Sequence, residues 1–82
     1  MAYTLTVNRI EYLVSDHAAE RMMLREITDQ MIIMTIKNGD MIEQKNGCYR
    51  FEYDIESGRI IIVAADLDLL LREIVTVFAA AE

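Results

Sequence analysis

The chain has no proline, no tryptophan, one cysteine and one histidine among its 82 residues. A single cysteine, Cys48, excludes an internal disulfide and any metal site built from several cysteines. Because the one histidine, His17, has no acidic triad beside it, we expect neither a metal site nor a cofactor. No apolar stretch reaches the roughly 18 residues that a membrane-spanning helix needs. The N-terminus also lacks the basic start and apolar run of a signal peptide. These absences predict a cytoplasmic protein with no membrane partner.

Basic residues are also scarce, since 8 Lys and Arg face 14 Asp and Glu, for a net charge of −6. Proteins that bind nucleic acid through a broad electrostatic field are usually basic. Any nucleic-acid site must therefore be a local patch. The length predicts a single domain over residues 1–82. The apolar content of 54% excludes disorder and indicates that a partner or second copy covers some apolar surface.

The first half of the chain has helical periodicity after a short strand. Alternation predicts a strand near residues 3–8, whereas "IEYLV" fits either a strand or a helical lead-in. Ser15 or Asp16 can cap a helix that runs to about Glu26 and buries Ala18, Ala19, Met22, Met23 and Ile27. Thr28 can cap a second helix that ends at Asn38–Gly39. The run "MIIMTI" within it also fits a buried strand.

The second half has the period of two that strands require. "DMIEQK" and "CYRFEYD" flank Asn46–Gly47, a two-residue hairpin signal, and "RIIIVAAD" and "LLREIVTVFA" follow. We predict that Tyr49, Phe51 and Tyr53 form the core face of their strand, and the alternative is an exposed surface on which bases stack. The sequence thus predicts an α+β fold in which two N-terminal helices pack on a four-stranded antiparallel sheet, with a further N-terminal strand as an option.

The stretch "SDHAAERMMLREIT" carries the residues best suited to chemistry. His17, Arg21 and Arg25 recur every four residues and share one helix face. An imidazole transfers protons near neutral pH, and a guanidinium fork binds phosphate. Cleavage of RNA without a metal needs both functions. The same row also fits an ordinary solvated helix face, in which Glu20 pairs weakly with an arginine.

Two other features have similar double readings. Asp66 and Asp68 fit an acid–base pair or plain turn residues, and the turn interpretation is the simpler one. Cys48 shares its strand face with Arg50, which could activate a thiol, although a small half-buried side chain explains it as well.

Together these stretches resemble a bacterial family of small domains of unknown function. The motif S-x-H-A-x-x-R-M-x-x-R-x-I begins at Ser15, Asn38–Gly39 ends the second helix, and I-V-T-V at residues 74–77 belongs to the last predicted strand. The resemblance covers residues 15–78. It extends to toxins of the RelE/ParE type and implies a RelE-like fold, metal-independent endoribonuclease activity or RNA binding, and an antitoxin partner.

The resemblance also assigns residues to roles. It implies that His17 is the catalytic acid or base, that Arg21 and Arg50 hold the scissile phosphate with support from Arg25, and that Thr76 orients a phosphate oxygen or the histidine. Toxins of this type are usually basic, whereas this chain is acidic. The acidic charge favours the competing hypothesis of a non-catalytic module that uses a sheet edge or its apolar surplus to form a homodimer or bind a protein partner. Whether the protein is an enzyme therefore stays open.

Overall fold

Six strands form one sheet, and two helices come between the second and third strands in the sequence. The computed structural model describes residues 2–80. Its elements, in chain order, are β1 (Tyr3–Val7), β2 (Ile10–Val14), α1 (Asp16–Leu24), α2 (Asp29–Asn38), β3 (Asp40–Glu43), a short 3-10 turn (Lys45–Gly47), β4 (Cys48–Ile55), β5 (Gly58–Asp68) and β6 (Leu71–Ala80).

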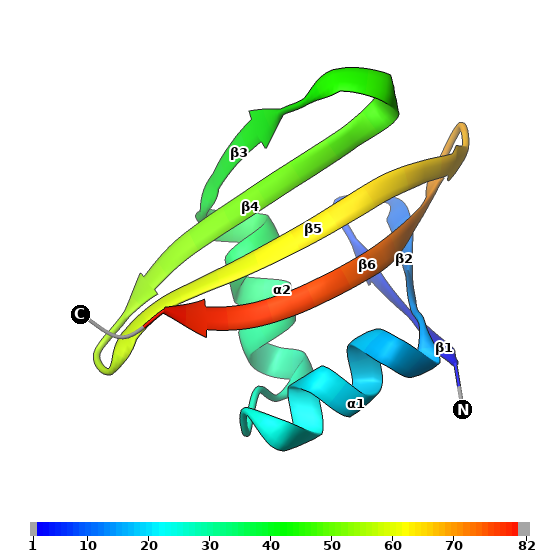
Figure 1. Ribbon diagram of the computed structural model, residues 1–82. Helices are drawn as coiled ribbons and strands as arrows, with labels where there is room; N and C mark the ends of the chain where they lie inside the picture. Colours follow the sequence, from blue (N-terminus) through cyan, green and yellow to red (C-terminus); the bar gives the residue numbers. More distant parts are fainter. Residues whose placement is uncertain (1, 81–82) are drawn as a thin grey trace.

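The sheet has the strand order β1-β2-β6-β5-β4-β3 (Figure 1). Strands β3 to β6 are successive antiparallel neighbours. The N-terminal hairpin joins them through β2, which pairs with β6 in parallel. The sheet is therefore mixed, and the β1–β2 hairpin covers the Leu71–Ile74 part of the β6 edge, which would otherwise present unpaired backbone groups.

The predicted four-stranded antiparallel sheet with two N-terminal helices is wrong, because a complete hairpin precedes the helices. "IEYLV" is a strand in which Tyr12 and Val14 are buried by alternation. Asn8 and Arg9 both have positive φ, at 51° and 70°, as in the tight turns that suit hairpins. The predicted hairpin at Asn46–Gly47 is confirmed, since β3 and β4 pair antiparallel on either side of it and both residues have positive φ, but its connection is longer than two residues. Four residues, 44–47, separate β3 from β4 and include the 3-10 turn.

Both helices begin at the predicted caps. The Ser15 hydroxyl accepts a hydrogen bond from the Ala18 amide at 3.1 Å, and the Thr28 hydroxyl accepts one from the Met31 amide at 3.2 Å. Helix α2 ends before Gly39, where a Cβ would lie 2.5 Å from the carbonyl oxygens of both Thr35 and Glu52. That close approach of two backbones requires glycine.

Helix α1 is shorter than predicted and buries fewer residues. It ends at Leu24, and the prediction that Met23 is buried is wrong, since Met23 is 80% exposed. Met23 follows Met22 by about 100° around the helix, which turns it away from the core. Ala18 and Met22 are buried as predicted.

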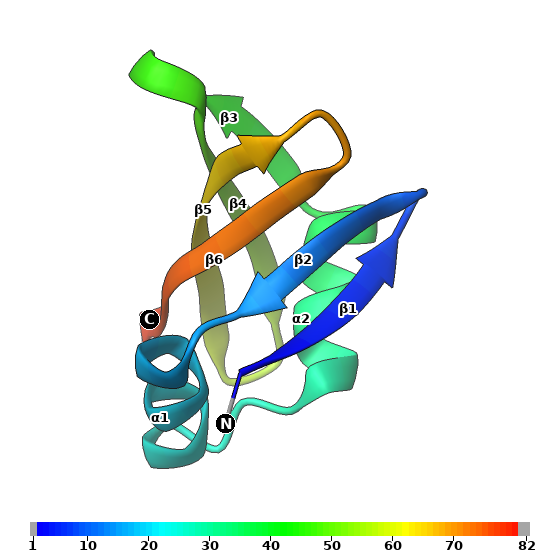
Figure 2. The same ribbon diagram turned by 90° about the vertical axis from the view of Figure 1, so that its right-hand side faces the viewer.

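The sheet curls around α2, which contacts β1 and β3 at the two edges as well as β4 and β5 in the middle. Figure 2 shows α2 against one side of the curled sheet and α1 beneath the end of β6. We call the side that holds α2 the concave face and the opposite side of β4–β6 the open face. Strand alternation puts Phe51, Ile62 and Val77 on the concave face, where all three are buried. The predicted core role of the aromatic strand is confirmed for Phe51, whose ring meets Tyr12 edge-on at 6.1 Å.

Among the described residues, no helix has the length and apolar content that crossing a membrane would require.

Candidate phosphate-binding surface

Helix α1 is fixed against β6 at its first turn. Ser15 follows β2 directly, and its hydroxyl donates to the carbonyl oxygen of Ile74 at 3.1 Å. Val14, the last residue of β2, is also the register partner of Ile74. From this point α1 and β6 run in the same direction across the molecule (Figure 1). This hydrogen bond therefore fixes the start of α1 relative to Ile74, and with it the position of each α1 side chain along β6.

The basic residues on and just after this helix have no side-chain partner among residues 2–80. His17 and Arg25 are exposed, and Arg21 is half-buried. Within residues 2–80, none of the three makes a side-chain hydrogen bond or ion pair. Their donors are therefore available to an anion from outside, and binding it would break no existing contact.

Thr76 and Arg50 lie in one cross-strand row of the open face. Arg50 is opposite Val63, and Val63 is opposite Thr76. Two strand spacings separate their backbones, about 10 Å. Thr76 lies two residues beyond Ile74, the anchor of α1, so it is the sheet residue of this group nearest to the helix.

Arg50 is already neutralised. Its Nε lies 2.6 Å from Oε2 of Glu52, although the N–H does not point at that oxygen and has no hydrogen-bond acceptor in line. Glu52 also binds Arg59 at 2.8 Å. The structure therefore places Arg50 on the same face as Thr76, but on the far side of β5 and occupied by a carboxylate. A phosphate would have to displace Glu52 to bind it.

Arg59 extends this ionic network along the open face. It donates from Nε to Asp54 at 2.7 Å, and this hydrogen bond holds the pKa of Asp54 below its ordinary value. A pocket of about 190 Å³ opens beside this network, between the end of α2 and β4. Its lining includes the carboxylates of Asp40, Glu52 and Asp54 around Arg59. Negative side chains outnumber positive ones there, so the pocket does not suit a phosphate.

A second arginine cluster, which the sequence did not reveal, closes the end of the concave face. The guanidinium carbon of Arg72 lies 3.9 Å from the centroid of the Tyr49 ring. Arg72 donates to the Tyr12 hydroxyl at 2.9 Å and to Asp66 at 3.1 Å, while the Tyr49 hydroxyl donates to Asp66 at 2.9 Å. That hydrogen bond raises the pKa of Tyr49, and burial raises that of Tyr12.

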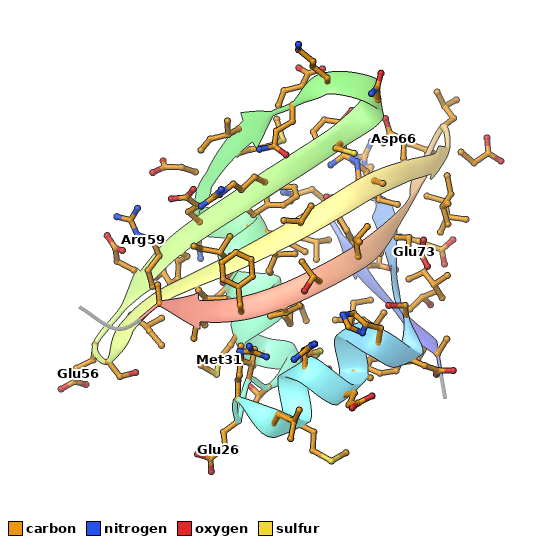
Figure 3. The ribbon with its side chains drawn as sticks, in the orientation of Figure 1. Glu26, Met31, Glu56, Arg59, Asp66 and Glu73 are labelled. Atoms are coloured by element: carbon orange, nitrogen blue, oxygen red, sulfur yellow. The ribbon has the colours of Figure 1, made fainter. Side chains whose placement is uncertain are left out.

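In this Arg72 cluster, Asp66 of β5 is the ion-pair partner of Arg72. Asp68 instead accepts from the Leu69 amide at 2.7 Å, in the tight connection to β6. The side chain of Arg72 is 14% exposed, so its charge is largely withdrawn from solvent. Figure 3 shows Arg59 and Asp66 toward opposite ends of β5, which separates the two ionic networks along the sheet. Within residues 2–80, no three His, Cys, Asp or Glu side chains are grouped closely enough to hold a metal ion.

The fold and the surface define a small α+β domain in which α1, with Arg21 and the following Arg25, borders the open face of the sheet. The chain belongs to the family described as "Domain of unknown function (DUF4258)", which matches residues 14–79. The match starts at the last residue of β2, so the rest of the β1–β2 hairpin lies outside it. Comparisons with curated proteins and with solved structures gave no match.

Proposed function

We propose that this protein binds RNA at the surface formed by α1 and β6 and cleaves it without a metal, as a cytoplasmic relative of RelE/ParE-type toxins. One observation carries the proposal. Arg50, Arg59 and Arg72 of the sheet are all ion-paired. Arg21 of α1 and Arg25, which follows the helix, have no ion pair among residues 2–80. In an acidic chain, guanidinium groups without internal partners are the natural ligands of a phosphate backbone.

The proposed chemistry follows from the residue types. The 2′-hydroxyl of RNA loses a proton as it attacks the phosphorus, and the departing 5′-oxygen gains one. His17, exposed in the first turn of α1, makes one of these two transfers, and solvent water makes the other. Arg21 and Arg25 stabilise the charge that develops on the phosphate oxygens. The Thr76 hydroxyl orients one of those oxygens. Arg50 joins them only when phosphate displaces Glu52.

The test of catalysis is incubation of the purified protein with a labelled single-stranded RNA in EDTA. We expect the wild type to cleave it, and His17→Ala to lose at least a hundredfold in rate, as expected for removal of a general acid–base group. Lys37→Gln, a change at an exposed residue of α2, is the matched control and should cleave normally. Equal cleavage by wild type and His17→Ala, or no cleavage by either, would contradict the catalytic role of His17.

A second candidate function rests on the sheet edge. All four residues of β3 are exposed, and Met41 and Ile42 are 54% and 45% exposed on an edge strand. An exposed apolar edge is the usual site of strand addition. In this alternative the protein is a non-catalytic module, and β3 pairs with a second copy or with an antitoxin.

The mass in solution separates the two candidates. The interaction module predicts a dimer of the purified chain that Ile42→Lys converts to a monomer. If the purified wild-type chain and the Ile42→Lys variant both sediment as monomers, the homodimer is excluded. An antitoxin would then be sought as a co-purifying protein whose binding Ile42→Lys abolishes.

A further inference from the structure

The aromatic side chains are divided unequally between the two faces of the sheet. The chain contains four tyrosines and two phenylalanines. Strand alternation and register put five of these six on the concave face: Tyr3, Tyr12, Tyr49, Phe51 and Tyr53. Phe78 is opposite Ile61, one step out of phase with the buried pair Ile62 and Val77. Phe78 is therefore the one aromatic residue on the open face among residues 2–80.

Phe78 is not part of the hydrophobic core. It is half-buried, and it does not belong to the core cluster or to the partly buried residues that pack against that cluster. Its cross-strand neighbour Ile61, on the same face, is 5% exposed. An aromatic ring on a face away from the core, next to a well-packed aliphatic residue, is a rigid and partly accessible platform.

The position of Phe78 along β6 matches the part of α1 that carries Arg21. From the Ser15–Ile74 hydrogen bond onward, α1 and β6 run in the same direction (Figure 1). Because the register shifts between Ile74 and Thr76, the partners of Ile74 and Phe78 on β5 are three residues apart, about 10 Å. Six helical residues separate Ser15 from Arg21, about 9 Å. Arg21 is therefore level with the stretch between Thr76 and Phe78, and Arg25 comes after it.

We propose that Phe78 is a base-stacking subsite for single-stranded RNA, whose phosphates are held by Arg21 and Arg25. The inference rests on the proposed function and names its substrate class. Aromatic platforms beside cationic side chains are the common means by which proteins bind unpaired bases, because every base has a π face to stack. Bases in a duplex are already stacked and paired, so a duplex gains nothing from Phe78.

The test compares two substitutions at this position. Phe78→Leu keeps an apolar side chain and removes the ring, whereas Phe78→Trp keeps a stacking surface. Because the chain has no tryptophan, Phe78→Trp also introduces a single fluorophore at the subsite. We expect Phe78→Leu to bind a labelled oligouridine about tenfold more weakly than wild type. Phe78→Trp should bind it at least as tightly, with quenched emission in the complex. A duplex of equal length should bind all three proteins alike.

The outcomes separate this inference from the function on which it rests. If Arg21→Gln weakens oligouridine binding and Phe78→Leu does not, RNA binding stands and the stacking subsite is overturned. Unchanged emission of Phe78→Trp at saturating oligouridine overturns it too. If the wild type binds no single-stranded RNA, both proposals fall. Circular dichroism and thermal melts of each variant identify any loss of affinity that comes from unfolding.

Discussion

Arg72 and Arg21 are the same residue type in opposite settings. Arg72 is stacked on Tyr49 and bound to Tyr12 and Asp66, with 14% of its side chain exposed. Arg21 is half-buried on α1 and has no internal partner within residues 2–80. The satisfied arginine holds strands β2, β4, β5 and β6 together. The unsatisfied one contributes nothing comparable to the fold, so the difference between them separates stabilising residues from candidate binding residues.

The largest expected effect is on stability. Arg72→Met removes one hydrogen bond to Tyr12, one to Asp66 and the contact with Tyr49, and it leaves the Tyr12 hydroxyl without its partner in the core. We expect a loss of about 2–3 kcal/mol in the free energy of unfolding. Arg21→Met should change it by less than about 0.5 kcal/mol. Urea denaturation of the two variants measures both. Equal losses would mean that the paired and unpaired arginines do not differ as described.

A smaller effect is expected from Tyr3, which belongs to the paired class. Its hydroxyl donates to Asp29 at 2.6 Å and so connects β1 to the start of α2. Burial, and then this carboxylate, raise the pKa of Tyr3 to about 12. The neutral phenol is therefore favoured in the folded state, and this contribution is complete below pH 10, the ordinary tyrosine pKa, and is lost as the pH rises to about 12.

Thermal melts between pH 8 and pH 12 test this linkage. Wild-type stability should fall across the upper part of that range, and Tyr3→Phe should lose less over the same interval. Part of the decline should persist in Tyr3→Phe, because the pKa values of Tyr12 and Tyr49 are also raised. Parallel curves for the two proteins would show that Tyr3 does not titrate as its contacts imply.

The parts of the fold that depend on local sequence were predictable. The caps at Ser15 and Thr28 and the stop at Gly39 depend on residues within one helical turn, and each is where the sequence indicated. The parallel join of β2 to β6 depends on residues about 60 positions apart, for which a single sequence carries no signal. The same holds for the Arg72 cluster, whose members come from four strands.

The candidate site was predictable in part. Alternation alone puts Arg50 and Glu52 on one strand face, so their ion pair had a signal in the sequence that was overlooked. The row that joins Arg50 to Thr76 needed the register of β4, β5 and β6. The arginines without partners could be identified only from the coordinates of every charged side chain, because pairing is a property of the whole surface.

The most direct test of the central claim is the affinity of the protein for a labelled single-stranded RNA, measured by fluorescence anisotropy over a range of salt concentrations. We predict that Arg21→Gln weakens binding about tenfold. It should also reduce the slope of log affinity against log salt by about 0.7, the contribution of one phosphate contact in a single strand. Lys37→Gln, with the same loss of charge on α2, should leave both unchanged. Equal affinities and slopes for Arg21→Gln and the wild type would contradict the account.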